Sequence, residues 1–167
     1  MEETLYAAAD SLIGCLREKK LTLGFAESCT GGLAAAAVVA VPGASDVFLG
    51  SVVSYANTVK HDLLGVPETV LESAGAVSAP CALQMARGAQ DALGCAIAVS
   101  VTGIAGPGGG SEKKPVGTVY SAVASECGAR GVRLSLGGAG DREQIRRAAV
   151  AAMLRLAHAE AKRFFPF

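Results

Sequence analysis

The sequence predicts one α/β domain in which a mixed sheet of about five strands carries helices on both faces. The chain has 167 residues, the size of one domain. Short apolar or β-branched runs alternate with helical patterns, and no repeat, linker or low-complexity tail interrupts them. Because 51% of residues are hydrophobic and 21 are glycine, we expect thin, closely packed layers of small side chains.

The first elements are a helix, a strand and an alanine-rich helix. Residues 4–20 place apolar side chains at helical spacing and end in two lysines, which suit the negative end of a helix dipole. Residues 21–26 are too short an apolar run for a helix and lead into Ser-Cys-Thr-Gly-Gly, so they read as a strand followed by a tight turn. The next helix should end at residues 41–45, which contain proline and glycine.

The middle of the chain predicts a strand and three helices. Residues 48–55 are β-branched and aromatic, as in a strand, and residues 57–64 resemble a short helix stopped by Gly65. A second short helix should follow Pro67. Residues 78–93 predict a long helix with a serine cap and a proline in its first turn.

Residues 95–101 have the continuous apolar character of a buried central strand. They lead into the most glycine-rich loop of the chain, residues 102–117. Residues 118–125 and 132–136 then predict a hairpin joined through residues 128–131.

The last helix should begin at Asp141. Arg142, in its first turn, can pair with a phosphate at the helix N-terminus, although a solvated arginine is equally ordinary. The inner stripe of this helix is expected to consist of Ile145, Ala149, Ala152, Met153 and Leu156.

Charge and composition exclude several classes of function. Fifteen Lys and Arg balance fifteen Asp and Glu, and no basic block with interleaved aromatics is present, so nucleic-acid and membrane-surface roles are disfavoured. The acidic first ten residues do not resemble a signal peptide, and the longest apolar run, Leu33 to Val41, is too short to cross a membrane. We expect a soluble, cytoplasmic protein.

Metal and disulfide chemistry are also disfavoured. The five cysteines are odd in number and form no CxxC pair, and the two histidines are almost a hundred positions apart. The sequence therefore predicts reduced thiols, no metal site and no cofactor.

One candidate site is the turn after the first strand. Ser28 stands where its hydroxyl can be exposed, and the N–H groups of Cys29, Thr30 and Gly31 can converge on an anion, which would give a nucleophile with oxyanion donors. The alternative is that Ser28 or Thr30 only caps the following helix, and from this segment alone capping is favoured. Cys29 lacks a histidine partner nearby in the sequence and should point into the core.

Tyr55 and Lys60 form a second candidate pair. They can converge only if the chain changes conformation between them, and Asn57, a good helix cap, stands where that change is expected. A partly buried lysine can lose its proton and activate a serine without histidine, although an ordinary lysine is solvated. His61 and Asp62 are adjacent and point apart, which argues against a Ser-His-Asp triad.

The glycine-rich loop is neither a Walker loop nor a GxGxxG fingerprint, so nucleoside-triphosphate binding loses support. Its backbone N–H groups can approach a ligand closely, with Thr102 and Ser111 as hydroxyl donors and Lys113-Lys114 nearby. The alternative is a flexible crossover whose glycines serve only its own turns.

Five stretches together resemble the CinA C-terminal domain family, whose stand-alone members include nicotinamide-nucleotide amidases. They run in order through nearly the whole chain: AESCTGGL, SYANTVKHDLLGV, GAVS, VTGIAGPGGGSEKKPVGTVY and GDREQIRR. The resemblance implies one domain over residues 1–167, without the additional N-terminal domain of longer members. The implied fold is a three-layer α/β/α sandwich with a mixed, mostly parallel sheet, and a homodimer is expected.

By resemblance, the activity is hydrolysis of the carboxamide of nicotinamide mononucleotide (NMN), a small nucleotide substrate. The family's serine, tyrosine and lysine correspond to Ser28, Tyr55 and Lys60, with Ser28 as nucleophile, Lys60 as base and Tyr55 as proton relay. The substrate-binding residues are expected to be Cys29, Thr30, Gly31, Thr102, Gly103, Ile104, Ala105, Gly106, Ser111 and Arg142. The alternative function is a non-catalytic nucleotide-binding module linked to competence or DNA-damage responses.

Overall fold

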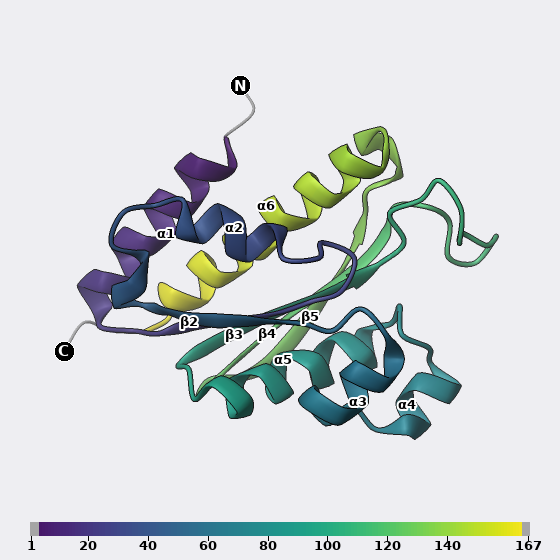
Figure 1. The fold of residues 1–167 in the computed structure, drawn as a ribbon, viewed down its shortest axis with the longest axis horizontal. Coiled ribbons are helices and arrows are strands. Elements are labelled where there is room, and N and C mark those ends of the chain that lie inside the picture. The colour runs from purple at the N-terminus through teal and green to yellow at the C-terminus, as the bar shows by residue number, and fades with distance from the viewer. Residues whose placement is uncertain (1–3, 165–167) are drawn as a thin grey trace.

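The computed structural model describes residues 4–164, so residues 1–3 and 165–167 of the expected domain lie outside the described part of the chain. It contains one five-stranded sheet between helices (Figure 1). The elements in chain order are α1 (Leu5–Lys19), β1 (Leu23–Glu27), α2 (Leu33–Val39), η1 (Ala44–Asp46), β2 (Phe48–Val53), α3 (Asn57–Leu64), α4 (Glu68–Ser73), α5 (Ala79–Leu93), β3 (Ile97–Gly103), β4 (Thr118–Ser125), β5 (Gly128–Ser135), η2 (Gly137–Ala139) and α6 (Arg142–Ala161).

The sheet is mixed, as the sequence predicts. Its strand order is β2-β1-β3-β4-β5. Both neighbours of β1 pair with it in parallel, while β4 pairs antiparallel with β3 and with β5. Four strands therefore run in one direction and β4 alone runs against them, and the carboxyl ends of β1, β2 and β3 lie at one end of the sheet.

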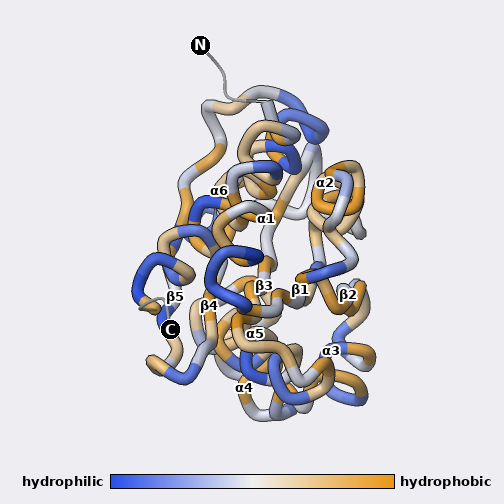
Figure 2. Tube along the Cα trace, turned by 90° about the vertical axis from the view of Figure 1, so that its left-hand side faces the viewer, coloured by the Kyte–Doolittle hydropathy of each residue, from blue (hydrophilic) through white to orange (hydrophobic). Residues whose placement is uncertain are grey.

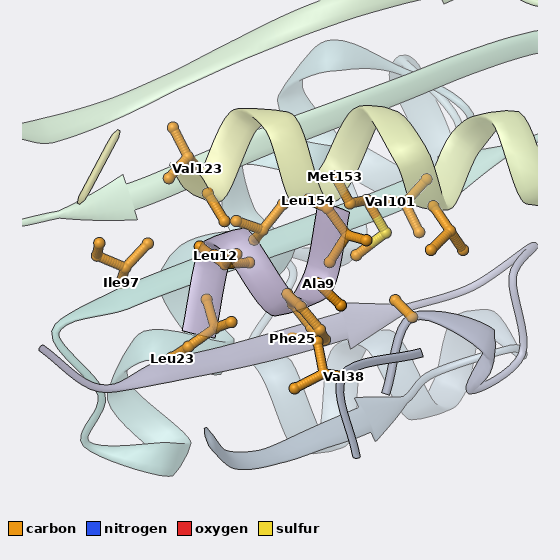
Figure 3. Packing of buried hydrophobic residues seen from close by; sticks show 14 of the residues in the cluster. Ala9, Leu12, Leu23, Phe25, Val38, Ile97, Val101, Val123, Met153 and Leu154 are labelled. Atoms are coloured by element: carbon orange, nitrogen blue, oxygen red, sulfur yellow. The ribbon is translucent and has the colours of Figure 1, made fainter. Parts of the chain in front are cut away.

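Helices cover both faces of the sheet and confirm the three-layer α/β/α architecture (Figure 1). On one face, α1, α2 and α6 enclose the largest core cluster, in which Phe25 of β1 and Met153 of α6 are fully buried (Figure 3). On the other face, α5 packs against the central strands through small side chains such as Ala82 and Ala86, and α3 and α4 pack against α5. In Figure 2 the hydrophobic colour marks strands between the two helical layers and also much of α2.

Three helix N-termini carry a side-chain cap. Thr4 caps α1, Ser78 caps α5 as expected, and Asp141 forms a reciprocal capping box with Gln144 at the start of α6. The expected cap at Asn57 is wrong: Ala56 is the capping residue of α3, and Asn57 lies in the first turn.

Two further expectations need correction. The β4–β5 hairpin exists, but β5 already begins at Gly128, which pairs with Ser125, so residues 128–131 belong to the strand and residues 126–127 form the turn. Glycine is tolerated there because β5 is an edge strand that contributes little to the core. In α6, Ala152 and Leu156 are half-buried, whereas Ile145, Ala149 and Met153 are fully buried.

None of the helices within residues 4–164 is both long enough and apolar enough to cross a membrane.

Candidate active site

A pocket of about 210 Å³ lies where β1, β2 and β3 end. In Figure 1 this is the right-hand end of the sheet, where the turn after β1, the connection from β2 to α3 and the loop after β3 meet. Ligands of open α/β sheets gather at this end because successive loops diverge there and leave a crevice. The pocket is lined by Ser28, Cys29, Tyr55, Asn57, Lys60, Ala76, Val77, Thr102, Gly103, Ala105 and Arg142.

Ser28 is fixed at the pocket by the backbone on both sides of it. Its N–H donates to the Val101 carbonyl of β3 at 3.1 Å, and its carbonyl accepts from the Gly31 N–H at 3.1 Å. Ser28 is 8% exposed and lines the pocket, so solvent or a ligand can reach it from the pocket. Ser28 is thus held rigidly with one open side, as a nucleophile requires.

Lys60 reaches Ser28 from α3. Its side chain is 1% exposed, and Nζ lies 3.0 Å from Ser28 Oγ. Nζ also donates to the carbonyl oxygens of Ser54 at 2.8 Å and Tyr55 at 3.0 Å. The change from β2 to α3 between residues 53 and 57 brings Lys60 to the end of the strand, as expected, but to the backbone carbonyl of Tyr55 and not to its hydroxyl.

Burial lowers the pKa of Lys60 below its usual 10.5, because a buried ammonium loses hydration. Within residues 4–164, no carboxylate lies within ion-pair distance of Nζ to oppose this effect. The three acceptors suit an ammonium. A neutral amine keeps two N–H groups for the carbonyls of Ser54 and Tyr55 and turns its lone pair toward Ser28 Oγ, so proton loss leaves the arrangement intact.

Glu27 is a buried carboxylate beside the site that sequence reasoning missed. Its carboxylate is fully buried at the end of β1 and accepts five hydrogen bonds of 2.7–3.0 Å. The donors are the hydroxyls of Thr30 and Ser51 and the backbone N–H groups of Gly32, Ala34 and Ala35. The only signal in the sequence is an acidic residue shortly before a helix start, which is the charge that a helix N-terminus favours.

Glu27 also determines whether the N-terminus of α2 can bind an anionic ligand. Neither Ser28 nor Thr30 caps this helix: the capping residue is Gly32, and Glu27 takes the free N–H groups of the first turn. The first turn of α2 is therefore already neutralised and is not open to an anion from a ligand. Gly31 is also withdrawn as an oxyanion donor because its N–H is bonded to the Ser28 carbonyl.

Cys29 belongs to both the core and the pocket. It is 7% exposed, it packs in the main core cluster, and its surface lines the cavity beside Ser28. Burial raises the pKa of the thiol to about 11, so Cys29 is protonated and weakly nucleophilic near neutral pH.

Tyr55 and Arg142 meet at the opening of the pocket. Tyr55 is 64% exposed, and its hydroxyl accepts a hydrogen bond from Arg142 Nη2 at 3.4 Å. Arg142 Nη1 donates to the Gly106 carbonyl at 2.5 Å, which fixes the guanidinium against the glycine-rich loop. The Tyr55 hydroxyl is therefore directed toward Arg142, while its backbone carbonyl contacts Lys60.

A second cavity, of about 410 Å³, shares Arg142 with the pocket. It lies beside the start of α6 and is also lined by Arg146 and Arg147. Arg146 Nη2 donates to the Thr30 carbonyl at 2.6 Å, so α6 braces the turn that carries Ser28. The shared arginine gives the pocket a positively charged outer end.

The glycine-rich loop contributes its first residues to the pocket. Thr102, Gly103 and Ala105 line the cavity, and Thr102 Oγ1 donates to the Ala76 carbonyl at 2.8 Å. Ala76 and Val77, from the connection between α4 and α5, form the adjoining wall. The sequence carries no signal for this wall, because its place depends on how α4 and α5 pack.

Other expected binding residues lie outside the cavity lining. Ile104 pairs through its backbone with Thr118 and Gly117, which extends the β3–β4 ladder. Gly106 contributes its carbonyl to Arg142. Ser111 closes a turn with Lys114 in the exposed part of the loop.

Thr30 and Gly31 are likewise absent from the lining. Both shape the turn after Ser28, Thr30 through Glu27 and Gly31 through the Ser28 carbonyl.

His61 takes no part in the pocket. Its Nδ1 lies 2.9 Å from the Val66 carbonyl, next to the end of α3. Among residues 4–164, no group of three or more His, Cys, Asp or Glu side chains is placed to hold a metal ion.

Comparison with known proteins gives the family. The model of the CinA C-terminal domain matches residues 5–161. A CinA-like protein of Geobacter metallireducens is 53% identical over 132 residues, which is 78% of this chain and 31% of that protein. A CinA-like protein of Pseudothermotoga lettingae is 50% identical over 117 residues, 70% of this chain and 29% of that protein. The chain thus spans about a third of the length of these relatives.

Solved structures share the fold. The competence/damage inducible protein CihA of Agrobacterium tumefaciens superposes with a TM-score of 0.90 at 40% identity, covering 95% of this chain and 98% of that one. A CinA superfamily protein of Klebsiella pneumoniae superposes with a TM-score of 0.92 at 28% identity, covering 97% and 100%. The chain belongs to the CinA C-terminal domain family.

Proposed function

We propose that the chain hydrolyses the carboxamide of NMN, giving nicotinate mononucleotide and ammonia through a serine acyl-enzyme. The observation that carries this proposal is the 3.0 Å contact between Ser28 Oγ and the buried Lys60 Nζ inside a pocket at the carboxyl end of the sheet. A serine beside a lysine with a lowered pKa is a nucleophile beside its base.

The reaction proceeds in two acyl transfers. Ser28 Oγ attacks the carboxamide carbon while its proton passes to Lys60 Nζ, and the C–N bond then breaks as the nitrogen takes this proton from Lys60 and leaves as ammonia. Water attacks the resulting ester and gives a proton to the now neutral Lys60, which passes it to Ser28 Oγ as the ester bond breaks and nicotinate mononucleotide leaves. Lys60 thus ends each cycle as it began.

The donor proposed for the oxyanion is the backbone N–H group of Cys29, which follows the nucleophile directly and belongs to a residue that lines the pocket. Gly31 is bonded to Ser28 and Gly32 to Glu27, and Thr30 is fully buried outside the lining, so Cys29 is the residue of this turn best placed to donate.

Tyr55 and Arg142 belong to the outer end of the substrate. Because the Tyr55 hydroxyl contacts Arg142, substrate placed between Ser28 and Tyr55 would bring its carboxamide to the serine and its phosphate to the guanidinium. The proton relay expected of Tyr55 toward the leaving ammonia requires its hydroxyl to turn from Arg142 toward Ser28 when substrate binds. That relay is part of this proposal, as are the homodimer and the cytoplasmic location.

Ammonia release from NMN by the purified protein tests the proposal. We expect turnover in the wild type, loss of turnover in Ser28→Ala, and retention of a large part of it in Cys29→Ala, which keeps the backbone amide. Ser28 Oγ does not cap α2 and is bonded to Lys60 Nζ, so Ser28→Ala removes a hydrogen bond worth about 1 kcal/mol, and a folded but inactive variant assigns the serine to chemistry. A wild type that binds NMN without releasing ammonia would support the alternative of a nucleotide-binding module.

A further inference from the structure

The connection between α4 and α5, residues 74–78, forms one wall of the pocket without secondary structure of its own. Ala76 and Val77 line the cavity from this connection. Within it, Ser78 Oγ donates to the Gly75 carbonyl at 2.7 Å. A segment without a helical or sheet ladder depends on contacts from elsewhere in the chain to keep one position.

Two side chains from the β3–β4 region supply such contacts. Thr102 Oγ1 donates to the Ala76 carbonyl at 2.8 Å from within the pocket. Lys114 Nζ donates to the Ala74 carbonyl at 3.0 Å from the glycine-rich loop, forty residues further along the chain. A carbonyl held by an ammonium is bound more strongly than one held by a neutral donor.

The loop is built to present Lys114 at this point. The Ser111 N–H donates to the Lys114 carbonyl at 2.9 Å, and the Lys114 N–H donates to Ser111 Oγ at 3.1 Å, which closes a tight turn. A Cβ at Gly110 would lie 2.8 Å from the Val116 nitrogen, so only glycine lets the two sides of the loop pack this closely. At its base the loop is held by Arg142, through the Gly106 carbonyl.

The neighbouring Lys113 makes a natural contrast. It has the same charge and lies one position away, but its side chain is exposed, whereas Lys114 is half-buried. Figure 1 shows the loop between β3 and β4 reaching beyond the right-hand end of the sheet, the end at which the pocket lies.

We infer that Lys114 is a positioning residue: through the Ala74 carbonyl it fixes the wall formed by residues 74–78 and thereby sets the affinity of the pocket for its ligand. The inference rests on the proposed function in taking NMN as that ligand. The chemical step is independent of this wall, because Ser28 and Lys60 are held by Val101, Ser54 and Tyr55.

The test compares Lys114→Met with Lys113→Met, a matched loss of one lysine charge, and with Lys114→Arg, which keeps a charged donor. Hydrogen–deuterium exchange of residues 74–78 should be faster in Lys114→Met alone. Steady-state kinetics with NMN should show KM raised about five- to tenfold in Lys114→Met with kcat changed less than about twofold, no change in Lys113→Met, and partial recovery in Lys114→Arg.

Each alternative outcome is decisive. Unchanged exchange in Lys114→Met would contradict the anchoring, and faster exchange with an unchanged KM would show that the wall does not set affinity. An equal KM effect in Lys113→Met would assign the change to the charge of the loop rather than to the contact with Ala74. A wild type that releases no ammonia would contradict the amidase proposal, and the exchange comparison would still decide whether Lys114 holds the wall.

Discussion

At Lys60 the proposed mechanism depends on the loss of a proton, and an arginine there would keep the charge without that property. We therefore expect Lys60→Arg to lose nearly as much kcat/KM for NMN as Lys60→Ala. Both variants also lose the hydrogen bonds from Lys60 Nζ to the carbonyls of Ser54 and Tyr55, so circular dichroism should first establish that each variant is folded. An active, folded Lys60→Arg variant would reduce Lys60 to an electrostatic role.

The burial of Lys60 also predicts how turnover depends on pH. The reactive form is the neutral amine, whose fraction increases with pH, and the lowered pKa shifts that increase below the usual value of 10.5. We expect kcat/KM for NMN to increase with pH and then level off. The profile should be measured above about pH 7, where a phosphate with a second pKa of about 6 is already ionised. A profile that falls over this range would contradict a lysine base.

At the scale of elements, the starts of α2 and α6, the two helix N-termini proposed from the sequence as anion sites, both carry a carboxylate of the protein itself. Glu27 occupies the first turn of α2, and Asp141 caps α6. These two N-termini are therefore largely satisfied by the protein itself, whereas α3, which starts at the pocket with Asn57, has no side-chain cap. The positive group left at the opening of the pocket is the Arg142 guanidinium, which faces both cavities.

This arrangement predicts how substrates are distinguished. NMN should be hydrolysed at least about tenfold better in kcat/KM than nicotinamide riboside, because one charge-assisted hydrogen bond contributes about 1.5 to 3 kcal/mol. Arg142→Ala should narrow that ratio. The matched control is Arg147→Ala, on the same helix but outside the lining of the pocket that contains Ser28. This variant should leave the ratio of kcat/KM between NMN and nicotinamide riboside unchanged. An unchanged ratio in Arg142→Ala would place the phosphate elsewhere.

At the scale of the molecule, patterns local in sequence predicted the fold well. Periodicity and turn residues located the strands and long helices, and the carboxyl-end rule located the pocket. The change of conformation between Tyr55 and Lys60 was also predictable, because the spacing allows no other convergence. The wall at Ala76 was not predictable because it depends on packing between distant segments. Glu27 at the start of α2 and the turn at Ser111 are local, but they are formed by side-chain hydrogen bonds that leave no mark in the hydrophobic pattern.

A second buried carboxylate, Glu160 near the end of α6, lies at the end of the sheet opposite the pocket. Its surroundings also depend on packing between segments that are distant in the sequence. It is fully buried and accepts hydrogen bonds from Ser125 of β4, from Arg130 of β5 and from Arg163. Burial alone would raise the pKa of Glu160, but the hydrogen bonds from these three donors outweigh it and lower the pKa. Glu160 thus ties α6 to two strands of the sheet in its ionised form.

The direction of that shift predicts the acid stability of the whole molecule. A carboxyl with a lowered pKa in the folded state stabilises the protein above its unfolded pKa, and this contribution is lost as the pH falls through the folded value. We expect Glu160→Gln to lower the free energy of unfolding by about 1–3 kcal/mol near neutral pH, and the difference from wild type to shrink toward about pH 3. Urea denaturation at both pH values measures it, with the exposed Glu18→Gln of α1 as control. Ammonia release should be unaffected, because Ser125 pairs with the first residue of β3 and the pocket lies beyond the last. A loss of stability that is equal at both pH values would show that Glu160 acts through packing and not through its charge.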